Sequence, residues 1–119
     1  MWIVDDMIDT AGSVEKCIRT LALLNPKEIN IISVHALFSP PAAEKLQALS
    51  REGLLKRTIV TDTVCCNNFI KIIPGLEVVQ SAELASKIVK AVINNESMSK
   101  LLRNFDASIY LGDKSTTSP

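Results

Sequence analysis

Short apolar runs alternate with amphipathic stretches along this chain. The runs are rich in β-branched residues and predict strands at residues 1–4, 29–34, 58–61 and 76–79. After the first, second and fourth of these runs, apolar residues recur at helical spacing and predict three helices. We expect Ser13 to cap the first helix, Pro40-Pro41 to open the second and Ser81 to cap the third.

Strands that alternate with helices indicate parallel pairing through crossover connections. We therefore predict an α/β fold, with a parallel sheet and helices on both faces. No internal repeat or linker interrupts the pattern, so we expect one domain over residues 1–105 and a flexible tail over 106–119. The first predicted strand lies at the terminus and leads into the most distinctive loop. This suggests a piece of a longer protein; the alternative is a short protein whose Met1 is native.

Charge and composition exclude several classes of protein. Thirteen basic residues balance thirteen acidic ones, which gives no electrostatic basis for non-specific binding to nucleic acid. No apolar run approaches the ~20 residues that span a bilayer, and no signal segment is recognised, so we expect a cytoplasmic protein without a membrane partner. Cys17, Cys65 and Cys66 fit neither a disulfide framework nor a zinc pattern, and we expect reduced, structural thiols.

The stretch from Ile3 to Ser13, IVDDMIDTAGS, carries the most informative chemistry. A hydrophobic strand ends in two acids, Asp5 and Asp6, at the carboxyl edge of the predicted sheet, where ligands of open α/β sheets bind. Asp9 then opens a loop of small residues that leads into a helix: Thr10, Ala11, Gly12 and Ser13. Small residues let the backbone approach a ligand, and a helix N-terminus offers free N–H groups to a phosphate.

The two halves of this segment suit the two ends of one ligand. Paired carboxylates suit vicinal hydroxyls or hydrated Mg²⁺, whereas the small-residue loop suits a phosphate monoester. A ribose 5-phosphate carries both groups. The plainer alternative is that Asp9 or Ser13 only caps the helix, as polar residues before helices commonly do.

The segment DDMIDTAGS resembles the motif with which type I phosphoribosyltransferase folds bind phosphoribosyl diphosphate, PRPP. The resemblance implies that Asp5 and Asp6 contact the ribose hydroxyls and that residues 9–13 wrap the 5-phosphate. Three later segments are similar to those of PRPP synthetases, the ribose-phosphate diphosphokinases, in the same order: SVHALFSPPAAEKL, VTDTV and NNESMSKLL. The chain thus resembles the C-terminal portion of such an enzyme.

The resemblance implies transfer of diphosphate from ATP to ribose 5-phosphate, which makes PRPP for nucleotide biosynthesis. It also implies Mg²⁺, whose main ligands lie outside this chain and which Asp5 and Asp6 contact only through water, and a homo-oligomer in which dimers form hexamers. No catalytic residue is expected within this chain, and we expect the chain alone to be inactive. Two alternatives stay open: a non-catalytic regulatory subunit associated with PRPP synthetases, and a phosphoribosyltransferase.

A few other side chains bear on function. Ser97 and Ser99 match positions near a phosphate or ADP effector site between subunits of regulated PRPP synthetases; the alternative is a polar helix end. His35, the only histidine, ends a predicted strand and is expected to be structural rather than catalytic. Trp2 is expected to pack in the core. Asp62 stands where PRPP synthetases usually carry Asn.

Overall fold

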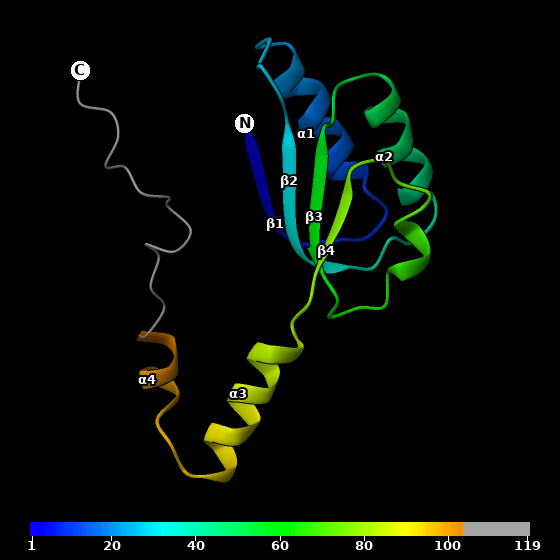
Figure 1. The fold of residues 1–119 in the computed structure, drawn as a ribbon. Helices are drawn as coiled ribbons and strands as arrows, with labels where there is room; N and C mark the ends of the chain where they lie inside the picture. The colour runs from blue at the N-terminus through cyan, green and yellow to red at the C-terminus, as the bar shows by residue number, and fades with distance from the viewer. Residues whose placement is uncertain (104–119) are drawn as a thin grey trace, which may run out of the picture. The chain divides into compact units, whose positions relative to one another are not determined.

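The computed structural model describes residues 1–103, which form two compact units (Figure 1). The first unit, Met1–Ser81, contains β1 (Trp2–Ile8), α1 (Gly12–Ala22), β2 (Asn30–Ala36), α2 (Ala42–Arg51), β3 (Arg57–Thr61), the short 3-10 helix η1 (Asn67–Phe69) and β4 (Leu76–Val79). The second begins at Ala82 and contains α3 (Ala82–Ile93) and α4 (Met98–Arg103). The boundary at Ser81 falls inside the predicted 1–105 domain, which stays a prediction. The predicted tail over 106–119 lies outside the described residues.

All four strands pair in parallel, in the order β1-β2-β3-β4. Val4 pairs with Ile32, and Ile32 pairs with Ile59 on the next strand. The predicted parallel α/β architecture is confirmed. Parallel pairing brings the carboxyl ends of the four strands to one edge of the sheet. At that edge, β1 runs into the acidic loop.

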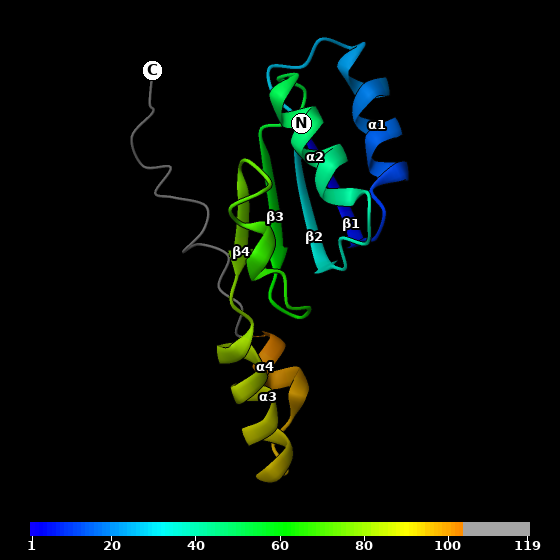
Figure 2. The same cartoon turned by 90° about the vertical axis from the view of Figure 1, so that its right-hand side faces the viewer.

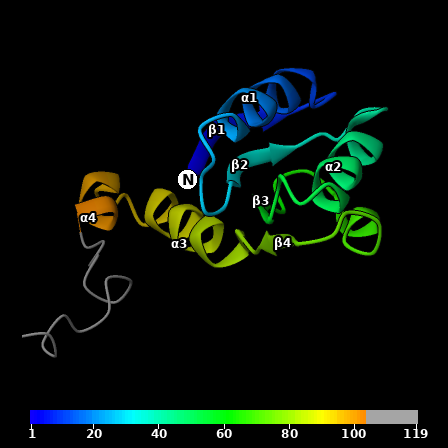
Figure 3. The same cartoon turned by 90° about the horizontal axis from the view of Figure 1, so that it is seen from above.

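Helices α1 and α2 cover the same face of the sheet (Figure 2, Figure 3). The strand order advances in one direction, and right-handed crossovers then place successive helices on one side. A sheet covered on both faces by its crossover helices needs a strand order that reverses. Within residues 1–81, helices therefore cover one face of the sheet rather than the two faces that were predicted.

The hydrophobic core of this unit lies between the sheet and its two helices. Ile31 and Val60 from the strands pack with Ile18, Leu46 and Leu49 from the helices, and all five are fully buried. Burying one such side chain stabilises the fold by about 1.5–3 kcal/mol. The core therefore fixes the position of α1, whose start follows the acidic loop.

The face of β1 that is turned away from α1 and α2 carries exposed apolar side chains. Val4 is 79% exposed and Trp2 is 50% exposed. Successive strand residues point to opposite faces, so Trp2 and Val4 share the side away from α1 and α2. The prediction that Trp2 packs in the core is therefore wrong in this structure.

The helix starts agree with the sequence in two cases of three. Helix α2 begins at Ala42, directly after Pro40-Pro41, and α3 begins directly after Ser81, whose hydroxyl donates to Asp62. Helix α1 begins one residue before Ser13, and its N-cap residue is Ala11. The predicted Ser13 cap is wrong because the left-handed turn at Ala11 starts the helix earlier.

The second unit is a pair of helices joined by residues 94–97. Asn95 has a φ of 52°, and the N–H of Glu96 donates to the carbonyl of Ala91 at 2.8 Å, a left-handed ending typical of helices. The sequence predicted α3 but not α4. Among residues 1–103, no helix has the length and apolar character that crossing a bilayer requires.

Candidate functional site

The loop between β1 and α1 starts from a fixed point. Ile8, the last residue of β1, is buried, and its carbonyl accepts hydrogen bonds from the N–H groups of Leu37 and Phe38, both at 3.0 Å. These bonds tie the end of β1 to the chain just beyond β2. The loop is thereby held at the carboxyl edge of the sheet.

Ala11 turns the chain from the loop into α1. Its φ is 60°, in the left-handed region that residues with a Cβ rarely adopt, and its methyl group is buried. Its carbonyl accepts the first helical bond, from the N–H of Glu15 at 2.9 Å. Helix geometry leaves the N–H groups of Gly12, Ser13 and Val14 without intrahelical acceptors, and no side-chain hydrogen bond caps α1. Strained backbone of this kind concentrates at ligand sites.

A cavity of about 220 Å³ opens over this loop. Its lining includes every residue predicted to bind sugar phosphate: Asp5, Asp6, Asp9, Thr10, Ala11, Gly12 and Ser13. The strand end and the helix start meet there because only residues 9–11 separate β1 from α1. These residues thus lie around one cavity, and their role in binding a sugar phosphate stays a prediction.

Three acids border the cavity, two at the end of β1 and one in the loop that follows. Asp5 is half-buried, and one of its carboxylate oxygens accepts the N–H of Asp6 at 2.9 Å. Asp6 and Asp9 are exposed. Within residues 1–103, no group of three or more His, Cys, Asp or Glu side chains is placed to hold a metal ion.

His35 lies at the same edge, where β2 pairs with β1 through Met7. Its Nδ1 is 2.8 Å from the hydroxyl of Thr63, which is 2.9 Å from the hydroxyl of Thr61. The Thr61 hydroxyl donates to the carbonyl of Val34 at 2.7 Å. The exposed imidazole is thus held by the end of the neighbouring strand, and its structural role stays a prediction.

One cation near the loop was missed by the sequence analysis. The ammonium of Lys45, from α2, lies 3.3 Å from the Glu15 carboxylate in the first turn of α1. A Cβ built on Gly12 would lie 3.7 Å from the same nitrogen. In the sequence, Lys45 stands out only as a polar residue between the buried positions Ala42 and Leu46 of α2. That position does not reveal its contact with α1.

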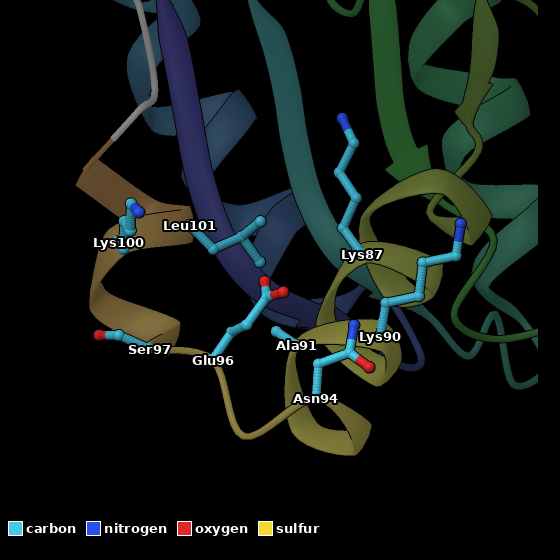
Figure 4. A pocket seen from close by; sticks show the side chains of 8 residues that line it. All are labelled: Lys87, Lys90, Ala91, Asn94, Glu96, Ser97, Lys100 and Leu101. Atoms are coloured by element: carbon cyan, nitrogen blue, oxygen red, sulfur yellow. The ribbon is translucent and has the colours of Figure 1, made fainter.

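Ser97 and Ser99 lie in the second unit, and only Ser97 lines its cavity. That cavity, of about 740 Å³, is lined by Lys87, Lys90, Ala91, Asn94, Glu96, Ser97, Lys100 and Leu101 (Figure 4). Lys87 and Lys90 project from α3, and Lys100 projects from α4 (Figure 4). An effector role for Ser97 and Ser99 stays a prediction.

The three cysteines form no disulfide, and the prediction of structural thiols fits only the buried one. Cys17 and Cys65 are exposed, and Cys66 is buried. Burial raises the pKa of the Cys66 thiol, which keeps it protonated and chemically inert at neutral pH.

A parallel α/β sheet whose first strand leads through an acidic, small-residue loop into a helix defines a phosphoribosyltransferase-like domain. The chain also matches the phosphoribosyl synthetase-associated domain over residues 1–103. The chain therefore belongs to the phosphoribosyl synthetase-associated domain family.

Relatives and a solved structure agree with this assignment. A ribose-phosphate pyrophosphokinase of Synechococcus elongatus is 35% identical over 104 residues, which cover 85% of this chain and 29% of the relative. The chloroplastic ribose-phosphate pyrophosphokinase 1 of Arabidopsis thaliana is 37% identical over 101 residues, 83% of this chain and 23% of the relative. The crystal structure of phosphoribosylpyrophosphate synthetase from Mycobacterium smegmatis superposes with a TM-score of 0.69 at 30% identity, over 79% of this chain and 30% of that one. The chain thus spans less than a third of the length of these proteins.

Proposed function

We propose that this chain supplies the ribose-5-phosphate site of a ribose-phosphate diphosphokinase. One observation carries the proposal: the seven residues predicted to bind sugar phosphate line one cavity at the start of α1. Membership of the phosphoribosyl synthetase-associated domain family supports it, because similar chains are named ribose-phosphate pyrophosphokinases.

The two halves of the cavity take the two ends of the substrate. The N–H groups of Gly12 and Ser13, with the hydroxyl of Thr10, donate to the 5-phosphate. The carboxylates of Asp5 and Asp6 accept hydrogen bonds from the ribose hydroxyls. Held at both ends, the sugar is oriented with its anomeric hydroxyl free to accept diphosphate from ATP, which yields PRPP and AMP.

Mg²⁺ fits this chain only as a hydrated ion. Asp5 and Asp6 offer carboxylate oxygens, but the described residues hold no cluster that would replace the ion's water ligands. When bound, the ion neutralises phosphate charge. The residues of this chain bind and orient the sugar phosphate.

The remaining parts of the proposal concern the whole protein. We expect ATP and PRPP as its other small-molecule partners, a homo-oligomer of dimers built into a hexamer, and a cytoplasmic location. The Arabidopsis thaliana relative is named chloroplastic, so location varies among similar proteins. Ser97 and Ser99 are proposed to contribute to a phosphate or ADP effector site.

A non-catalytic regulatory subunit is the second candidate. One observation favours it: among the cavity-lining residues, none carries a basic side chain to neutralise a transferred diphosphate. Against it stands the intact loop from Asp5 to Ser13, which a purely regulatory role does not require.

Titration calorimetry of the 119-residue chain tests the substrate site. We expect ribose 5-phosphate to bind and unphosphorylated ribose to bind far more weakly. The Cβ that Gly12→Val introduces would lie no closer than 3.7 Å to atoms beyond its chain neighbours and the backbone of its own helix, so the variant should obstruct the loop and abolish binding while the chain stays folded. A folded wild-type chain that releases no heat with ribose 5-phosphate contradicts the proposal.

A further inference from the structure

Lys45 brings a positive charge to the rim of the candidate site. Its ammonium and the Thr10 hydroxyl lie 3.7 Å and 3.8 Å from the point where a Cβ on Gly12 would sit. Gly12 lines the cavity, and its missing side chain leaves that point open. These distances exceed a hydrogen bond, so a phosphate oxygen at this point would bond to Lys45 only after the side chain moved toward it by less than about 1 Å.

The charge balance of the cavity calls for such a cation. Its lining holds three acids, Asp5, Asp6 and Asp9, and no lysine or arginine. A phosphate monoester at neutral pH brings roughly two further negative charges, which backbone N–H groups only partly offset. Lys45, on the neighbouring helix, is the cation that the structure places beside Gly12.

The present partner of Lys45 can release it. Glu15 also accepts a hydrogen bond from Arg19 at 3.2 Å, and Arg19 in turn forms a forked pair with Glu52, at 2.8 and 3.2 Å. Glu15 therefore keeps a cation if Lys45 turns toward a ligand. The Lys45–Glu15 pair is partly exposed, and such pairs contribute little to stability. A phosphate dianion carries more negative charge than the Glu15 carboxylate, so the Lys45 ammonium favours the phosphate when both are present.

We propose that Lys45 is the phosphate-contacting cation of this site and distinguishes phosphorylated from uncharged sugars. Glu15 is the partner of the Lys45 ammonium when no ligand is bound, and it competes with the phosphate for that charge. The proposal rests on the proposed ribose-5-phosphate site and adds to it a side chain from a second helix. Lys45 contacts the ligand and Glu15 competes with it, so their removal has opposite effects.

The test is calorimetry of the 119-residue chain with ribose 5-phosphate at low ionic strength. Lys45→Met should weaken binding about tenfold, equivalent to about 1.4 kcal/mol for one charge-assisted hydrogen bond. Lys45→Arg should restore most of the affinity. Glu15→Gln should bind as tightly as the wild type or up to about threefold more tightly, because the competing carboxylate is gone.

A matched control removes another lysine that forms an ion pair with a glutamate, far from the loop. Lys56 pairs with Glu28 at 2.8 Å and precedes β3, at the sheet edge opposite the loop. Lys56→Met should bind ribose 5-phosphate like the wild type. Circular dichroism of each variant confirms that it is folded.

The outcomes separate this proposal from the one on which it rests. If the folded wild type does not bind ribose 5-phosphate, the proposed site fails and the role of Lys45 fails with it. If the wild type binds and Lys45→Met binds equally well, the site stands and the role of Lys45 is overturned. If Glu15→Gln weakens binding as much as Lys45→Met, Lys45 acts only through its ion pair, and the proposal is likewise overturned.

Discussion

Asp62, just beyond the end of β3, accepts two hydrogen bonds from Ser81, one from its N–H at 2.8 Å and one from its hydroxyl at 2.5 Å. The hydroxyl bond, followed by the backbone bond, lowers the pKa of the Asp62 carboxyl below its ordinary value of 3.8. Asn, usual at this position in PRPP synthetases, accepts similar bonds but does not titrate. Asp62 therefore adds a pH-dependent contact at the carboxyl edge of the sheet.

Asp62→Asn should reduce stability at neutral pH and lose that disadvantage in acid. The folded-state pKa lies below the unfolded one, so the contribution of Asp62 is complete above about pH 5 and is lost as the pH falls through the folded pKa, below 3.8. Urea unfolding of both chains at pH 7 and near pH 3 measures the difference. An equal difference at both pH values would show that the charge of Asp62 is irrelevant.

Gly75 and Gly53 form a matched pair. Both have a positive φ, 72° and 74°, but a Cβ on Gly75 would lie 2.3 Å from the carbonyl oxygen of Lys56, whereas Gly53 has nothing within 4 Å. Gly53→Ala should cost about 1–2 kcal/mol from backbone conformation alone. Gly75→Ala adds a clash with backbone and should cost about 3 kcal/mol or more. Chemical denaturation checks the order, and equal losses would contradict it.

Thr58→Val should stabilise the first unit. Thr58 is fully buried, and its hydroxyl has no hydrogen-bond partner in the structure. An isosteric valine removes that unpaired group and should add about 1 kcal/mol to the free energy of unfolding.

Thr61→Val is the control for this change. The Thr61 hydroxyl donates to the Val34 carbonyl at 2.7 Å, so its removal should destabilise by about 1 kcal/mol. Each substitution replaces a threonine hydroxyl of β3 with a methyl group. Loss of stability in both would mean that the Thr58 hydroxyl has a partner after all.

The 119-residue chain should form no AMP when incubated with ATP, Mg²⁺ and ribose 5-phosphate. Diphosphate transfer needs cations around the transferred group, and the lining of the candidate cavity contains no basic side chain. A ribose-phosphate diphosphokinase assayed in the same mixture shows that AMP is detectable. AMP formation by the purified chain, abolished by Gly12→Val, would refute the expectation.

Three of the four strands could be predicted closely because local pattern decides them, whereas β1 runs on to Ile8 and includes Asp5 and Asp6, which were expected to follow it. The apolar run after Pro74-Gly75 becomes β4 at Leu76–Val79, as predicted, since its turn and alternation are local. The seven site residues converge because one continuous segment supplies them.

Other features depend on tertiary contacts and could not be read from one sequence. The Ser13 cap failed because Ala11 adopts a left-handed conformation that its residue type does not suggest. Trp2 was misplaced because burial of a strand face depends on which side the helices cover. Lys45 reaches Glu15 across two helices, thirty residues apart in the sequence, and no periodicity reveals such a pair.

The most direct test of the account maps the ligand onto the backbone. Amide chemical shifts of the 119-residue chain would be followed by NMR during titration with ribose 5-phosphate, and separately with ribose. We predict that ribose 5-phosphate shifts the amides of residues 9–13 most strongly, because the proposed site places the phosphate at this loop and at the N–H groups of Gly12 and Ser13, and that ribose leaves them nearly unchanged. Shifts elsewhere, or none in a demonstrably folded chain, would contradict the assignment of this loop as a sugar-phosphate site.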